Sequence, residues 1–180
     1  AGVEPQSQTR IAFTGPFDYT AQNRVDIRVM AEALQLRLME RMREDLGGTY
    51  SVGVNASYER IPEGRYTVSI QFGSDPERAE ELRGVVFEEI RGLQADGPSQ
   101  EDVEKVVEAE KLSLETNLQL NPYWAVQLMY SREADQDPRF LLDGTRYDNV
   151  SRELIQQGAQ LYLNEEQVVI VVLLPVEKIG

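Results

Sequence analysis

Two neighbouring segments of the chain, 50–58 and 66–72, alternate apolar residues with small or polar ones. Successive side chains of a strand point to opposite faces, so each segment predicts a strand with one apolar and one polar face. The connection between them contains the turn residues Pro62 and Gly64, which predicts an antiparallel hairpin. The apolar face of this hairpin must be covered, and that requirement constrains the rest of the fold.

A long helical pattern over 20–46 can supply the cover. Its apolar stripe is widened on one side, which is typical of a helix largely surrounded by neighbours, and Gly47-Gly48 ends it because glycine accepts the left-handed conformation of a helix C-cap. We expect the helix to pack across the hairpin and to share a buried core with it, formed by Leu34, Tyr50, Val52, Val54, Val68 and Ile70.

The remaining pattern adds two strands and several helices. A short strand is predicted at 10–13, helices at about 76–95 and 99–118, helix starts at Asn121 and Asp137, and a helix from Ser151 to Leu163. The apolar run 168–174 predicts a strand covered on both faces or central in its sheet. This order indicates an α+β fold, a mainly antiparallel sheet with helices packed on one side. Residues 1–9 are interpreted as a linker or mobile arm before a single domain over 10–180.

Charge narrows the classes of partner. The chain has 18 basic and 31 acidic side chains, a formal net charge of −13, and no basic tract. Nucleic acids and anionic membrane surfaces are bound through clustered Lys and Arg, so both are poor partners for this chain.

The chain contains neither cysteine nor histidine. Thiolate nucleophiles, imidazole bases and the usual zinc ligands are therefore excluded, and we expect no metal or other cofactor here and no catalytic residue. Acidic residues occur close together at 80–81, 88–89, 108–110 and 165–166. We interpret all of them, including Glu108 and Glu110, as solvated helix faces or turns rather than metal sites.

The corner between the long helix and the first hairpin strand is the strongest candidate for function. Arg43 lies near the helix end and Tyr50 near the strand start, so the turn can bring a guanidinium and a phenol side by side. Both groups can donate hydrogen bonds to a bound peptide carbonyl. Alternatively, Arg43 pairs with Glu40 or Asp45 or caps its own helix, and Tyr50 is a core residue.

The sequence Met-Arg-Glu-Asp-Leu-Gly-Gly-Thr-Tyr-Ser at 42–51 resembles the signature of the non-catalytic C-terminal domains of pitrilysin/insulinase-type zinc metallopeptidases, the inverted zincins. Further similarities are Phe-Gly-Ser-Asp-Pro-Glu at 72–77, Gly-Pro-Ser-Gln-Glu-Asp at 97–102 and Val-Ile-Val-Val at 169–172. The likeness extends over about 9–176 and is strongest to the bacterial PqqL-type proteases.

The resemblance implies a pitrilysin/mitochondrial-processing-peptidase-like domain from the later part of a larger protease, without the strand and helix that usually open such domains. Zinc would sit in another domain of the parent enzyme, which hydrolyses peptides in an enclosed chamber. Arg43 and Tyr50 would bind the substrate peptide. The other parent domains would be the partners, and the periplasm the compartment. Two alternatives remain: a structural or assembly subunit of the same family, and an unrelated acidic binding module.

Overall fold

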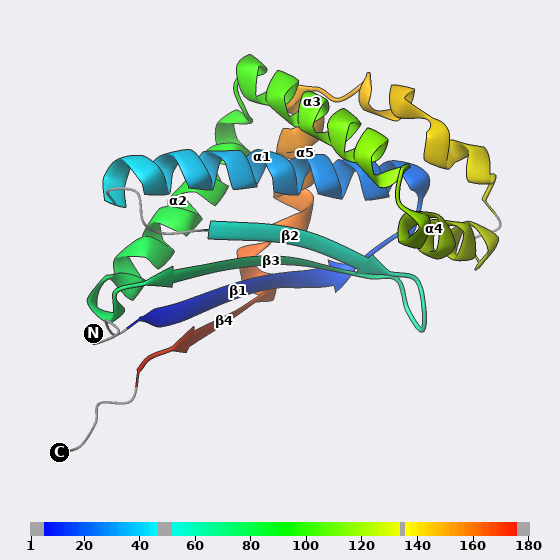
Figure 1. Cartoon of the computed structure of the whole chain (residues 1–180). Helices are drawn as coiled ribbons and strands as arrows, with labels where there is room; N and C mark the ends of the chain where they lie inside the picture. Colours follow the sequence, from blue (N-terminus) through cyan, green and yellow to red (C-terminus); the bar gives the residue numbers. More distant parts are fainter. Residues whose placement is uncertain (1–5, 47–51, 134–135, 176–180) are drawn as a thin grey trace.

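The computed structural model describes residues 6–46, 52–133 and 136–175. Within them, four antiparallel strands form one sheet in the order β2-β3-β1-β4 (Figure 1). The strands are β1 (Ser7–Pro16), β2 (Val52–Glu59), β3 (Arg65–Ser74) and β4 (Val168–Leu173). The predicted hairpin is confirmed as β2 and β3, whose register runs from Val52 opposite Phe72 to Glu59 opposite Arg65.

The long helix α1 (Ala21–Leu46) crosses one face of this sheet (Figure 1). Leu34, Val68 and Ile70 are completely buried between helix and sheet, and Val52 is buried beside them. Val54 is only half-buried, because β2 is an edge strand, and Tyr50 lies outside the described residues. The α+β fold with helices on one side of an antiparallel sheet is therefore confirmed.

Four further helices follow the hairpin or precede the last strand. Gly97, at φ 69°, ends the first of them in a conformation that favours glycine, and Ser99 with Asp102 forms a capping box at the start of the next. The helices are α2 (Ala79–Asp96), α3 (Gln100–Asn117), α4 (Asn121–Glu133) and α5 (Arg152–Tyr162). Short 3-10 turns are η1 (Pro76–Arg78), η2 (Pro138–Leu142), η3 (Gly144–Tyr147) and η4 (Glu165–Gln167).

Strands β1 and β4 differ from the sequence-based expectation. β1 is a central strand that begins at Ser7, with Ser7 and Thr9 buried, so residues 7–9 belong to the sheet rather than to an arm. The expectation that the last apolar run is covered on both faces or central is wrong. Among the strands that the structure describes, β4 pairs only with β1, and Val169 to Leu173 are all exposed.

None of the helices that the structure describes is long and apolar enough to cross a membrane.

Candidate functional site

The predicted site lies at the corner between α1 and β2. Arg43 is in the last turn of α1, which ends at Leu46, and the next described residue is Val52. Tyr50 and the side chain of Arg43 lie outside the described part of the chain. The pairing of these two residues therefore stays a prediction, and so does the alternative that Arg43 pairs within its own helix.

The side chain of Gln35, near the middle of α1, attaches this helix to β2. Gln35 Nε2 donates to the carbonyl oxygen of Val52 at 2.9 Å, and the amide nitrogen of Val54 donates to Gln35 Oε1 at 2.6 Å. Within the described sheet β2 is an edge strand, and these backbone groups face away from its neighbour β3. Gln35 thus takes the place that a neighbouring strand would have at these two backbone groups. Its position within an apolar helix stripe gave no signal of this role.

Two arginines in the C-terminal half of α1 also form ion pairs with α2. Arg37 Nη2 lies 2.9 Å from Glu89 Oε2, and Arg41 Nε lies 3.7 Å from Glu89 Oε1. Arg37 also donates to the carbonyl oxygen of Gly97 at 3.4 Å. These arginines hold α2 against α1, so the helix that carries Arg43 is positioned on two sides.

The acidic residues selected from the sequence do not all behave alike. Glu80 and Glu81 pair with nearby arginines on an exposed face, as expected. The expectation of a solvated face is wrong for Glu110, which is 7% exposed and accepts a hydrogen bond from Arg28 Nη2 at 2.5 Å. Arg28 is 82 residues away in sequence, so helix periodicity alone could not reveal this partner.

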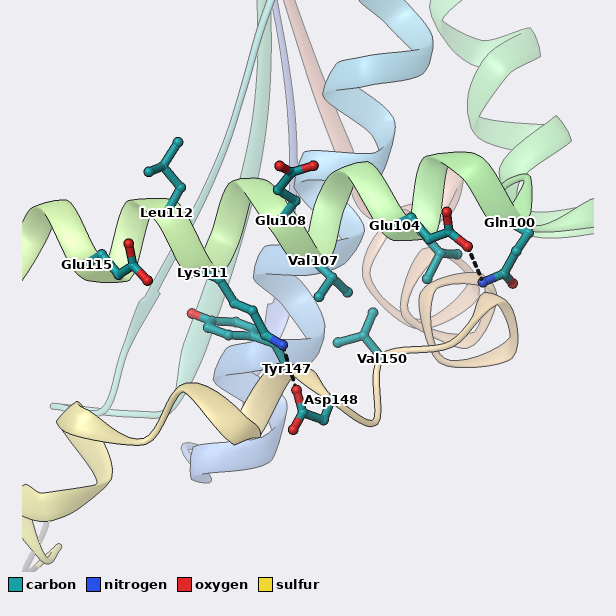
Figure 2. Close-up of a pocket in the computed structure, with 11 residues that line it drawn as sticks. Gln100, Glu104, Val107, Glu108, Lys111, Leu112, Glu115, Tyr147, Asp148 and Val150 are labelled. Carbon is teal, nitrogen blue, oxygen red and sulfur yellow. Dashed lines mark hydrogen bonds and ion pairs between the residues drawn. The ribbon is translucent and has the colours of Figure 1, made fainter.

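A hollow of about 760 Å³ lies between α3 and η3 (Figure 2). Inside this hollow, Lys111 Nζ of α3 forms an ion pair with Asp148 Oδ1 at 2.6 Å. Tyr147 also lines the hollow. The other charged lining residues are carboxylates, Glu104, Glu108 and Glu115. The hollow is separate from the α1–β2 corner and offers neither a nucleophile nor a base activated by a neighbour.

Metal binding is not supported by the described side chains. Within 6–46, 52–133 and 136–175, no group of three or more acidic side chains is arranged to hold a metal ion. Since the whole chain lacks Cys and His, its residues do not fit the zinc that proteases resembling it would carry.

Comparison with known proteins gives a consistent result. A family model described as the peptidase M16 inactive domain matches residues 2–110. "Zinc protease PQQL-like" of Arabidopsis thaliana is 30% identical over 131 residues, which cover 68% of this chain and 14% of that protein.

Two solved structures have the same fold. The periplasmic protease PqqL from Escherichia coli matches with a TM-score of 0.78 and 21% identity, over 96% of this chain and 19% of that one. A mutant of the ferredoxin protease FusC, solved in complex with Arabidopsis ferredoxin, matches with a TM-score of 0.78 and 24% identity, over 98% and 20%. The chain thus spans a fifth or less of the length of these three proteins.

Proposed function

Because the chain belongs to the peptidase M16 family as an inactive domain, we propose that it is the substrate-binding, non-catalytic domain of a zinc-dependent peptidase. The observation that carries this proposal is the family match over 2–110, which includes Arg43 and Tyr50. The zinc site belongs to another domain of the parent protein, since this chain has no cysteine or histidine to build one.

The task left to this chain is to hold and orient a peptide. The guanidinium of Arg43 and the hydroxyl of Tyr50 donate hydrogen bonds to a backbone carbonyl of the substrate. The position of Arg43 is supported indirectly, because Gln35 and the two arginine contacts to Glu89 fix the C-terminal half of α1 against β2 and α2. A rigid support of this kind favours precise positioning of a substrate.

The partners of the domain are the other domains of the same protease and its peptide substrate, inside an enclosed chamber. The relatives support a protein or peptide substrate, since one is named a ferredoxin protease and was solved with a ferredoxin. A periplasmic location is supported by the name of the Escherichia coli relative.

The test is peptidase activity of the full-length parent protein, with and without a chelator. We expect chelator-sensitive cleavage, and we expect Arg43→Ala to lower kcat/KM by roughly ten- to more than hundred-fold, because a charged hydrogen bond contributes about 1.5 to 3 kcal/mol. Tyr50→Phe removes only the hydroxyl and is expected to lower kcat if that group acts in the transition state.

Arg91→Ala is the matched control. Arg91 lies on α2 and forms an exposed ion pair with Glu165, so its loss is expected to leave kcat/KM unchanged. A full-length parent with no chelator-sensitive activity would instead support a structural or assembly subunit. Full activity of Arg43→Ala would show that Arg43 does not bind the substrate and serves only the end of its own helix.

A further inference from the structure

Three arginines gather around one small cavity at the N-terminal end of α1. Arg24 and Arg28 come from α1 and Arg146 from η3, and they line a space of about 40 Å³ together with aromatic rings. We call this cavity the arginine pocket; its other lining residues include Tyr58, Tyr123, Phe140 and Tyr147. Such a concentration of positive charge stands out in a chain with a net charge of −13.

Among the described residues, only one of the three arginines forms a salt bridge, although the carboxylate of Asp143 is near enough to interact electrostatically with Arg146. Arg28 is paired with the buried carboxylate of Glu110. Arg24 donates to Gln136 Oε1 at 2.6 Å and to the carbonyl oxygen of Thr20 at 3.3 Å, which are both neutral acceptors. The pocket therefore carries an excess of positive charge.

The hydrogen-bond donors of Arg146 are satisfied even less completely. It donates to the carbonyl oxygen of Phe140 at 3.3 Å and to the hydroxyl of Tyr147 at 3.1 Å, while its Nε is buried and has no hydrogen-bond partner. Buried guanidinium nitrogens are normally paired, so an unpaired one beside a cavity indicates a missing acceptor.

The aromatic rings hold the two arginines in place. The Cζ atoms of Arg24 and Arg146 lie 5.7 and 5.2 Å from the ring centroid of Phe140, so both cations contact one ring. Arg24 also lies 5.0 Å from the centroid of Tyr19, and Arg146 lies 4.9 Å from that of Tyr147. Cation–π contacts of this kind fix the guanidinium planes before any ligand arrives.

We propose that the arginine pocket binds a carboxylate group. A carboxylate is small and planar, matches the two-pronged donor geometry of a guanidinium, and carries negative charge to the two arginines that form no salt bridge among the described residues. A phosphate dianion is larger, so it fits a space of about 40 Å³ less well.

A neighbouring hollow indicates what the carboxylate is attached to. It has a volume of about 420 Å³ and shares Tyr58 with the arginine pocket. Its lining combines the aromatic and apolar side chains of Tyr19, Ile61, Met129 and Tyr130 with the charged residues Glu59, Arg60 and Glu133. Ile61 and Met129 on its walls are 69% and 50% exposed. The geometry thus suits a peptide whose carboxylate enters the arginine pocket while an apolar side chain lies against Tyr58, Ile61 and Met129.

This site is distinct from the α1–β2 corner and does not depend on the proposed function of that corner. Arg28 and Arg43 are 15 residues apart on one helix, which corresponds to roughly 22 Å. Loss of the arginine pocket is therefore expected to leave the corner in place, so the two proposals can fail separately.

The experiment is fluorescence anisotropy on the 180-residue chain with a labelled pentapeptide of glycine, alanine and leucine that ends in leucine with a free carboxylate. The same peptide as a C-terminal amide is expected to bind at least tenfold more weakly. A third peptide, amidated but with glutamate at its last position, separates side-chain from main-chain carboxylates. Equal binding of the acid and the plain amide would overturn the proposal.

Arg24→Gln and Arg146→Gln are each expected to weaken binding of the acid peptide at least fivefold and to leave binding of the amide unchanged. Arg91→Gln, on the exposed side of α2, is the matched control and is expected to bind like the parent chain. Thermal unfolding of each variant checks that it folds.

Unchanged binding by both pocket variants, or an equal loss in the control, would overturn the proposal. Stabilisation by sodium acetate without peptide binding would overturn the peptide assignment and restrict the pocket to small free acids.

Discussion

Arg28 on α1 and Glu110 on α3 form a largely buried ion pair, with 2.5 Å between Nη2 and Oε2. The pair connects two helices whose partners are 82 residues apart in sequence. It also fixes Arg28 at the edge of the arginine pocket, where Tyr58 and Tyr147 lie. Burial would lower the pKa of Arg28, but the charge of Glu110 and the nearby tyrosines raise it overall, so the arginine stays charged.

Removing one member of this pair is expected to destabilise the chain more than removing both. Arg28→Gln leaves the carboxylate of Glu110 buried without a cation, and we expect the free energy of unfolding to fall by about 2 to 4 kcal/mol. The double variant with Glu110→Gln is expected to recover part of that loss. Urea unfolding of both single variants and the double variant measures the coupling. Additive losses would show that the two residues act independently.

The contact of Gln35 with β2 predicts a second effect. Gln35→Leu keeps the size of the side chain but leaves the carbonyl of Val52 and the amide of Val54 without their partner. The free energy of unfolding should therefore fall by about 1 to 3 kcal/mol. Hydrogen exchange should be faster at the amide of Val54. Gln71→Leu, on the exposed face of β3, is the control and should change the free energy of unfolding by less than about 0.5 kcal/mol. Unaltered exchange at Val54 would contradict the role assigned to Gln35.

The exposed edge of β4 predicts self-association of the isolated 180-residue chain at high concentration. Val169 and Val171 are 59% and 48% exposed on a strand with no partner on its outer side among the described residues. Edges of this kind pair with other strands unless a charge prevents it. Val169→Lys combined with Val171→Lys is expected to reduce association in sedimentation velocity while the unfolding midpoint stays nearly constant. A chain that remains monomeric over the whole concentration range would contradict this prediction.

Tyr162 predicts a loss of stability at alkaline pH. Burial, followed by the negative charge of Asp26 and by Tyr66, raises the pKa of Tyr162 to about 12. Because this is above the ordinary value of 10, its contribution to stability is complete below pH 10 and is lost as the pH rises towards 12. Tyr162→Phe should reduce the fall in the free energy of unfolding between pH 10 and 12 by about 1 to 2 kcal/mol. Tyr130 is exposed, so Tyr130→Phe is the control and should lose as much free energy of unfolding between pH 10 and 12 as the parent chain. An equal effect of both variants would refute the prediction.

The sequence predicted the elements that depend on local periodicity. The hairpin, the long helix and the capped starts of α3 and α5 follow from alternation, helical spacing and Ser caps, and the structure confirms them. β4 was misplaced because a continuous apolar run looks the same in a central strand and in an edge strand, and only the sheet order distinguishes the two.

The candidate site could be predicted only in part. Arg43 and Tyr50 are close in sequence, so their association could be proposed from the chain alone. Gln35, Glu110 and the arginine pocket depend on contacts between distant segments. Arg24 and Arg28 show helical spacing, but Arg146 reaches them only because α3 and η3 fold back beside α1.

Helix α1 is a single element of 26 residues that carries the arginine pocket near one end and Arg43 near the other. Each residue of a helix adds about 1.5 Å and 100° of rotation. Inserting or deleting one residue between Arg28 and Leu38 would therefore turn one end away from its neighbours while the other stayed in place. A change of seven residues restores the direction to within about 20°, but it alters the separation of the ends by about 10 Å. Related domains should therefore differ in this segment by substitutions, without insertions or deletions.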